Sequence, residues 1–333
     1  MERDTENSAR EASEPQHSDD HPARPTLRRI VLGIDFRAPS IDALRWTAHN
    51  FAPDSELILV HAIHHNAVGF PGIHPAPADS DVETEPTARA RLGAIAAELL
   101  GNRAVRVEVR EDRPAAALAY LAESTGADVI VLGPHGGRES IPGIGSTAER
   151  LIRMSPIPVL LVVHPPERPI QHLVVAADQV DLMSEVLRWA DVFAHNGNAR
   201  VTLAHVFDPR FRALEGWQAE SVRPEAAELQ HGYPGFGDYV QATEAWLSGL
   251  SRELTGSPRI ELAIAVGEPG REIIALAQRT DADMIVMGRR GRWRRVPAVI
   301  GSTASTVLRG APCPVLIVVD APDARFDPWG VEE

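Results

Sequence analysis

The chain has 333 residues, of which 44 % are hydrophobic and only 5 % aromatic, and its formal net charge at pH 7 is −13. This length suits two domains with cores built mainly from Ala, Val, Leu and Ile, while the negative charge argues against a general attraction to nucleic acid or to anionic membranes. No apolar run approaches the ~18 residues of a membrane-spanning helix. The single cysteine, Cys313, rules out an intrachain disulfide, which suits a cytoplasmic location.

The two ends of the chain differ in composition from its middle. Residues 1–26 are rich in Glu, Asp, Ser, Pro and His and predict a disordered acidic tail, and residues 321–333 predict a short C-terminal tail. Between them we predict a first domain over residues 27–164 and a second over residues 170–320, joined by a short linker that contains three prolines.

The first half alternates short apolar runs with helical stretches. The first run ends at Asp35, and a helical stretch around Leu44, a second strand and a long loop over residues 62–86 follow it. A third strand, a helix at about 114–125, a fourth strand with a glycine loop, another helix and a last strand complete the half. The predicted strands lie at residues 29–35, 57–61, 105–109, 127–133 and 158–163.

The second half repeats this order. His61 and His205 are 144 positions apart, whereas Asp128 and Asp283 are 155 apart. The extra residues therefore lie between His205 and Asp283, where the stretch 206–240, with a long loop at about 206–236, is the natural place for them. The predicted strands lie at residues 172–178, 201–205, 259–265, 282–288 and 314–319. This order predicts two tandem doubly wound α/β domains, Rossmann-like, each with a five-stranded parallel sheet covered by helices on both faces.

An aspartate follows the first strand of each half. In such sheets ligands bind beyond the carboxyl ends of the strands, where the strand order reverses. We therefore expect Asp35 to face Gly133–Gly137 and Asp178 to face Gly288–Gly291. A carboxylate there can accept hydrogen bonds from a ribose hydroxyl or an adenine amino group; the alternative is an aspartate that caps the following helix.

The second half carries a glycine pattern that suits phosphate binding. It reads Gly288, two residues, Gly291, nine residues, then Gly301, Ser302 and Thr303 at a predicted helix start. Glycines allow close backbone approach, and the helix N-terminus favours an anion. The same segment contains the arginines Arg289, Arg290, Arg292, Arg294 and Arg295. These predict a polyphosphate site, with a solvated charged loop as the alternative.

The first half carries a weaker form of the pattern. Gly133 and Gly136 are followed by eight residues before Gly145 and Ser146, and Arg138 is the only arginine between them. Ser146 and Glu149 have the spacing of a capping box, which would use N–H groups that a phosphate needs. We therefore expect weaker nucleotide binding in the first half, to which Gly33 and Gly137 also contribute as candidate binding residues.

Other candidate sites are less well supported. The histidines at 61, 64, 65 and 74 lack carboxylates or cysteines at ligand spacing, so structural roles are favoured over metal binding. Cys313 stands at the start of an apolar strand, where a packed thiol is favoured over a redox switch. Neither a Walker-type phosphate loop nor a nucleophile elbow is present, and we assign no catalytic or metal-ligating residue.

These residues resemble the universal stress protein family in its tandem form. The family pattern, Gly-x2-Gly-x9-Gly-Ser/Thr followed by a helix and a Pro-Val strand, is matched fully in the second half and with one residue fewer in the first. The resemblance implies an adenine nucleotide site for ATP, with Mg²⁺ accompanying it, formed by Asp35, Asp178 and the glycine-serine residues. It also implies that the last strands, Val159–Val163 and Val315–Val319, pair within the chain as a pseudo-dimer.

Two departures from the family pattern bear on affinity. The Gly-Ser that often follows the first-strand aspartate is replaced by Phe36 and Arg37 and by Gln179 and Val180, and Ala176 matches Gly33. The main hypothesis is a cytoplasmic, ATP-binding stress-response sensor or regulator, with a homodimer of tandem chains as a further possibility. A slow ATPase or nucleotidyl-transfer enzyme, or a scaffold without nucleotide, are the alternatives.

Overall fold

The computed structural model describes residues 27–51, 53–64, 83–134, 144–178, 182–208, 236–289 and 300–319. The predicted tails and most of both long loops lie outside these residues. The elements of the first half are β1 (Arg29–Gly33), α1 (Ala38–Asn50), β2 (Glu56–Ile63), α2 (Glu85–Leu100), β3 (Val105–Glu111), α3 (Pro114–Thr125), β4 (Val129–Leu132), α4 (Ser146–Met154) and β5 (Val159–Leu161). Those of the second half are β6 (His172–Ala176), α5 (Met183–Gly197), β7 (Arg200–Phe207), α8 (Phe236–Ser251), β8 (Ile260–Val266), α9 (Pro269–Arg279), β9 (Met284–Gly288), α10 (Ser302–Gly310) and β10 (Val315–Val318).

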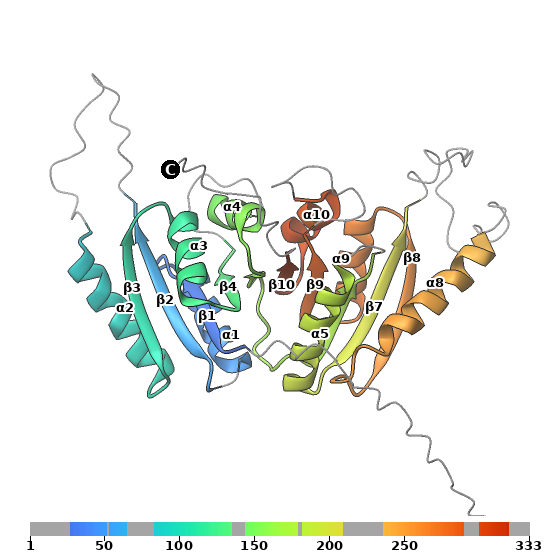
Figure 1. The fold of residues 1–333 in the computed structure, drawn as a ribbon, viewed down its shortest axis with the longest axis horizontal. Helices are drawn as coiled ribbons and strands as arrows, with labels where there is room; N and C mark the ends of the chain where they lie inside the picture. The colour runs from blue at the N-terminus through green and yellow to red at the C-terminus, as the bar shows by residue number, and fades with distance from the viewer. Residues whose placement is uncertain are drawn as a thin grey trace, which may run out of the picture.

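All these strands belong to a single ten-stranded sheet with the order β3-β2-β1-β4-β5-β10-β9-β6-β7-β8. Neighbours within each half are parallel, which confirms the predicted pair of doubly wound α/β units. The halves stand side by side and meet where β5 and β10 pair antiparallel, with Leu160 opposite Leu316 (Figure 1). The pairing of the last strands within the chain is thus present.

Local sequence signals explain where several helices begin and end. Proline occupies the first turn of α1 and opens α3 and α9, because its fixed φ suits this position and its missing N–H needs no partner there. Helix α3 ends at Gly126, whose left-handed conformation (φ 62°) closes the helix. Among the described helices, none is long and apolar enough to cross a membrane.

The two faces of the sheet form two apolar cores, and each core runs through both halves. One core packs Leu44 of α1 and Leu92 of α2 in the same cluster as Leu187 of α5 and Leu247 of α8. The other contains the buried side chains of α3, α4, α9 and α10. Because the inner strands are covered on both faces, they are almost purely apolar, as expected of parallel sheets.

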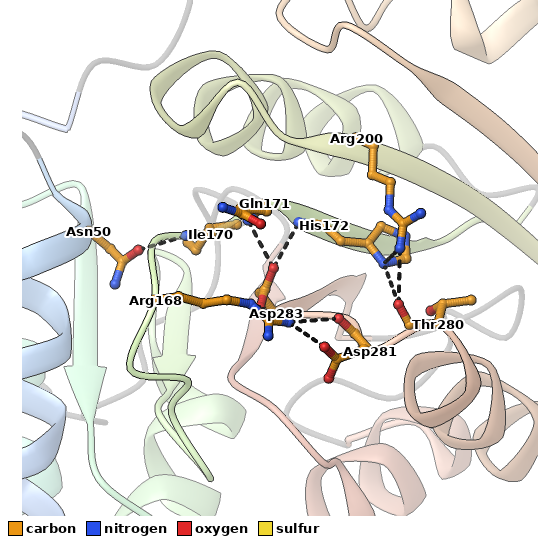
Figure 2. A network of polar contacts seen from close by, with 9 residues as sticks. All are labelled: Asn50, Arg168, Ile170, Gln171, His172, Arg200, Thr280, Asp281 and Asp283. Atoms are coloured by element: carbon orange, nitrogen blue, oxygen red, sulfur yellow. Dashed lines mark hydrogen bonds and ion pairs between the residues drawn. The ribbon is translucent and has the colours of Figure 1, made fainter.

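A repeated aspartate fixes the start of the first strand in each half. Asp128 Oδ2 accepts from the N–H groups of Arg28 and Arg29, at 2.7 and 2.8 Å. Its counterpart Asp283 accepts from those of Gln171 and His172, both at 2.9 Å (Figure 2). The duplication therefore extends to individual hydrogen bonds.

Near the start of β6, hydrogen bonds tie the linker to both halves of the molecule. Arg168 Nε donates to Asp283 Oδ1 at 2.9 Å, and its guanidinium also bonds Asp281. The N–H of Ile170 donates to Asn50 Oδ1, at the end of α1, at 3.0 Å (Figure 2). These contacts hold the linker at the amino end of β6, opposite the candidate site of the second half.

Candidate functional site

Within each half, the first-strand aspartate and the fourth-strand glycine emerge from the carboxyl ends of adjacent parallel strands. The antiparallel pairing of β5 and β10 places these ends of the two halves at opposite edges of the sheet. In the first half β1 and β4 are parallel with Leu32 opposite Val131, so Asp35 and Gly133 both follow the carboxyl ends of adjacent strands. In the second half Val175 lies opposite Val286, which gives Asp178 and Gly288 the same relation. In each half these ends lie where the strand order reverses, the usual position for a ligand in such sheets.

Each glycine segment is closed by a backbone hydrogen bond. The N–H of Gly145 donates to the carbonyl oxygen of Pro134 at 3.1 Å, and that of Gly301 donates to the carbonyl oxygen of Arg289 at 3.0 Å. Gly145 and Gly301 are the N-cap residues of α4 and α10, and neither helix has a side-chain cap at this position. The first-turn N–H groups at both helix starts therefore favour an anion.

The predicted capping box in the first half is wrong. Helix α4 begins one residue earlier than that motif requires, so Ser146 is its first helical residue and Gly145 is the cap. The Glu149 carboxylate instead bonds Arg153 at 2.7 Å, one turn along the helix. The helix start is thus as open to an anion as that of α10, and this reason for weaker binding in the first half is removed.

Asp35 has a structural partner of its own. Its Oδ1 accepts from the N–H of Arg37 at 3.0 Å, and its own N–H points to Ser40 Oγ at 3.3 Å. These bonds organise the turn that leads from β1 into α1, but Arg37 is the N-cap residue of α1 and the helix has no side-chain cap, so Asp35 does not cap it. Asp178 lies two residues after the last residue of β6, Ala176, at the carboxyl end of that strand.

The turn after Asp35 is filled by an aromatic cluster that the sequence did not predict. Phe36 has φ 62°, a conformation that favours glycine, and its ring lies 4.3 Å from that of His61. The Arg91 guanidinium lies 4.1 Å from the Phe36 ring centroid. Packing on both partners compensates for the backbone strain, which is of order 1–3 kcal/mol.

The repeated histidines at the ends of β2 and β7 serve the structure. His61 Nδ1 lies 2.7 Å from the carbonyl oxygen of Ile34, and its Nε2 lies 2.9 Å from Glu83 Oε2. His205 repeats the first contact with Ala177, at 2.9 Å, and bonds Tyr239 at 2.7 Å. Within the described ranges, no group of three or more His, Cys, Asp or Glu side chains is placed to hold a metal ion.

Gly33 and Gly133 are both needed for packing. A Cβ on Gly133 would lie 2.6 Å from the carbonyl oxygen of Pro39, in the first turn of α1. A Cβ on Gly33 would lie 2.7 Å from Leu132 Cδ2. Gly133 therefore lets the end of β4 approach α1, and Gly33 lets β1 pack closely against the Leu132 side chain, whether or not a ligand is bound.

The Arg289 side chain contacts the first half of the molecule. It is only 7 % exposed, and its guanidinium donates to the carbonyl oxygens of Ile152 and Arg153, at 3.2 and 3.1 Å. The prediction that this side chain lines a phosphate site is therefore not supported. The other predicted loop residues lie outside the described residues: Gly136, Gly137, Arg138, Arg290, Gly291, Arg292, Arg294 and Arg295.

Cys313 is a packed thiol, as the sequence favoured. It is buried at the entrance to β10, and burial, with smaller effects from Asp283 and Asp281, raises its pKa to about 12. Because the thiolate is the reactive form, this cysteine is unsuited to redox chemistry in the folded protein.

The model of the universal stress protein family matches residues 26–163 and again residues 169–319. The chain belongs to the universal stress protein family. It is a tandem member, because each match covers one of the two halves described above.

Some of the relatives match nearly the whole chain, and others match about half of it. A universal stress protein of Mycolicibacterium smegmatis is 25 % identical over 300 residues, which cover 87 % of this chain and 96 % of that protein. One from Synechocystis sp. is 30 % identical over 155 residues, which cover 44 % of this chain and 96 % of that protein. A solved universal stress protein structure from Archaeoglobus fulgidus is 17 % identical, with a TM-score of 0.57. The match covers 90 % of this chain and 98 % of that chain, and it supports the fold.

Proposed function

We propose that this universal stress protein binds ATP at the carboxyl ends of its strands and acts as a nucleotide-dependent regulator in a stress response. The observation that carries the proposal is the repeated closure of Gly145 on Pro134 and of Gly301 on Arg289, at the open starts of α4 and α10. Membership of the universal stress protein family, which has an ATP-binding branch, supports it.

The second half is the better candidate for the nucleotide, because it has the complete family spacing. In this proposal the backbone at Gly288 and Gly301, with Ser302 and Thr303 in the first turn of α10, holds the phosphates. Asp178 accepts hydrogen bonds from the ribose or the adenine. Mg²⁺ accompanies the phosphates and reduces their charge.

Calorimetric titration of the full chain with ATP and Mg²⁺ tests the proposal. Gly301 and Gly145 both have extended backbone angles that valine can adopt, so Gly301→Val and Gly145→Val add a side chain without straining the backbone. Loss of even one charge-assisted hydrogen bond, worth about 1.5–3 kcal/mol, predicts about tenfold weaker binding or more for Gly301→Val. The Gly145→Val variant measures the share of the first half.

Gly93→Val is the matched control. A Cβ at Gly93, on α2, meets nothing within 4 Å, so this variant should bind ATP as the wild type does. Absence of heat at millimolar ATP in the wild type contradicts the proposal. Phosphate release above the Gly301→Val background would favour the slow ATPase instead. Analytical ultracentrifugation tests the further proposal of a homodimer of tandem chains.

A further inference from the structure

One side chain of the second glycine segment belongs, by its contacts, to the first half of the molecule. The Arg289 backbone is held within its own half: its N–H donates to the carbonyl oxygen of Val318 at 2.8 Å, and its carbonyl accepts from Gly301. Its buried guanidinium, however, reaches the carbonyl oxygens of Ile152 and Arg153 in α4. Both helices involved, α4 and α10, lie near the junction of the two halves (Figure 1).

This contact caps α4 from outside its own half. The last carbonyl groups of a helix lack partners within the helix, and Arg289 supplies donors to two of them. It also places a positive charge at the negative end of the helix dipole. Since α4 has only nine residues, its last turn is a large part of the helix. Arg289 therefore contributes to the stability and position of the whole helix.

The other end of α4 opens the candidate site of the first half. Gly145 caps this end and Ser146 is the first helical residue. A short helix moves as one body, so a displacement at Arg153 also reaches Ser146. The reverse contact cannot form in the same way, because Pro134 occupies the position that matches Arg289 and has no side-chain donor.

We propose that Arg289 is a positioning residue that couples the two candidate sites, so that an anion held at Gly288 and Gly301 stabilises α4 and the site at Gly145 and Ser146. The proposal rests on the proposed function. A phosphate held at Gly288 and Gly301 restrains the residue before Arg289 and the residue that donates to its carbonyl oxygen, and the buried side chain then holds the end of α4 more firmly. By linkage, an anion at the first site favours binding at the second to the same extent.

Hydrogen exchange of the full chain, followed at the amides of α4 with and without ATP and Mg²⁺, tests the coupling. Every chain compared carries Gly145→Val, so that ATP does not slow exchange by binding at the start of α4 itself. Arg289→Met removes the donors but keeps much of the apolar stem, and Arg309→Met, at an exposed arginine at the end of α10, is the matched control. In the chain that keeps Arg289 and in the control, ATP should slow exchange in α4 by about threefold or more, within the range for coupling through packed elements. In Arg289→Met the slowing should be lost, although calorimetry still detects ATP.

The outcomes separate the two proposals. If ATP binds and slows exchange in α4 equally in Arg289→Met and the control, the coupling through Arg289 is overturned while the nucleotide function stands. If no variant and no wild-type protein binds ATP, the proposed function fails and the coupling fails with it. Arg289→Lys keeps the charge and one donor group and should restore part of the response; it serves as the second variant if Arg289→Met does not fold.

Discussion

At three residues, the neighbouring side chains determine the backbone conformation or the hydrogen-bond partner. Phe36 takes a backbone conformation that favours glycine, because His61 and Arg91 hold its ring. His61 and His205 make the same bond to a backbone carbonyl, but one has a carboxylate and the other a phenol as its second partner. The repeat conserves the local geometry between the halves while the chemistry around it differs.

His172 gives the stability a dependence on pH. Burial, with the nearby charge of Arg200, lowers its pKa from the ordinary 6.5, while the carbonyl of Thr280 and the carboxylates of Glu261 and Asp283 act weakly in the opposite direction. The unfolded chain therefore takes up the proton more readily than the folded chain. Consequently the free energy of unfolding should decrease as the pH falls through 6.5 towards the lower pKa of the folded state.

Urea denaturation between pH 7.5 and pH 5 measures this dependence. In His172→Gln the decrease below pH 6.5 should be shallower than in the wild type, although the variant is less stable at neutral pH because the bonds to Thr202 and Thr280 are altered. His49→Gln, at an exposed histidine of α1, is the control and should keep the wild-type slope. Equal slopes in all three proteins would contradict this account.

At the scale of elements, the start of β6 depends on a buried carboxylate. Asp283 is 1 % exposed and accepts hydrogen bonds from two backbone N–H groups at the start of β6, while Asp281 nearby is 84 % exposed. Replacing Asp283 by Ala leaves these donors and Arg168 Nε without their acceptor. Unsatisfied buried donors cost about 1–3 kcal/mol each, so Asp283→Ala should lower the free energy of unfolding by about 3 kcal/mol or more.

Asp281→Asn is the matched control for this prediction, because Asp281 has φ 50°, a left-handed conformation that asparagine tolerates. It removes an exposed ion pair to the same arginine, and such pairs contribute little. Chemical denaturation of both variants should therefore show a much larger loss for Asp283→Ala. Similar losses would mean that the Arg168 ion pairs, and not the backbone contacts, fix the start of β6.

The sequence was sufficient to predict the elements and their order, because apolar runs and glycine loops occur twice in the same register. It also placed Asp35 next to Gly133, and Asp178 next to Gly288, at the carboxyl ends of adjacent strands in each half. The cap of α4 was missed because it depends on where the backbone leaves its extended conformation, at Gly145. The direction of Arg289 was missed because its partners lie 136 and 137 positions away in the sequence.

At the scale of the whole molecule, the two halves share their cores. Both apolar clusters include residues of each half, and Phe51 of the first half lies 5.6 Å from Phe193 of the second, between ring centroids. Unfolding one half would expose the apolar surface of the other. We therefore expect a single cooperative unfolding transition for the full chain.

Fluorescence of single-tryptophan variants measures this cooperativity. Trp46 and Trp189 are buried at matching positions of α1 and α5, so each reports on one half. Variants that keep only one of them should unfold at the same denaturant concentration, and circular dichroism should give the same midpoint. Two separated midpoints would show that the halves unfold independently.

The junction at β5 and β10 joins two units of one polypeptide, so dilution cannot separate them as it separates the subunits of a dimer. Identical subunits must carry the same residue on both sides of such a junction. A covalent fusion is free of this constraint, and here arginine stands at position 289 and proline at its mirror position 134. The fused architecture thus permits the two units to carry different residues at their junction, so that a single asymmetric contact links both candidate sites.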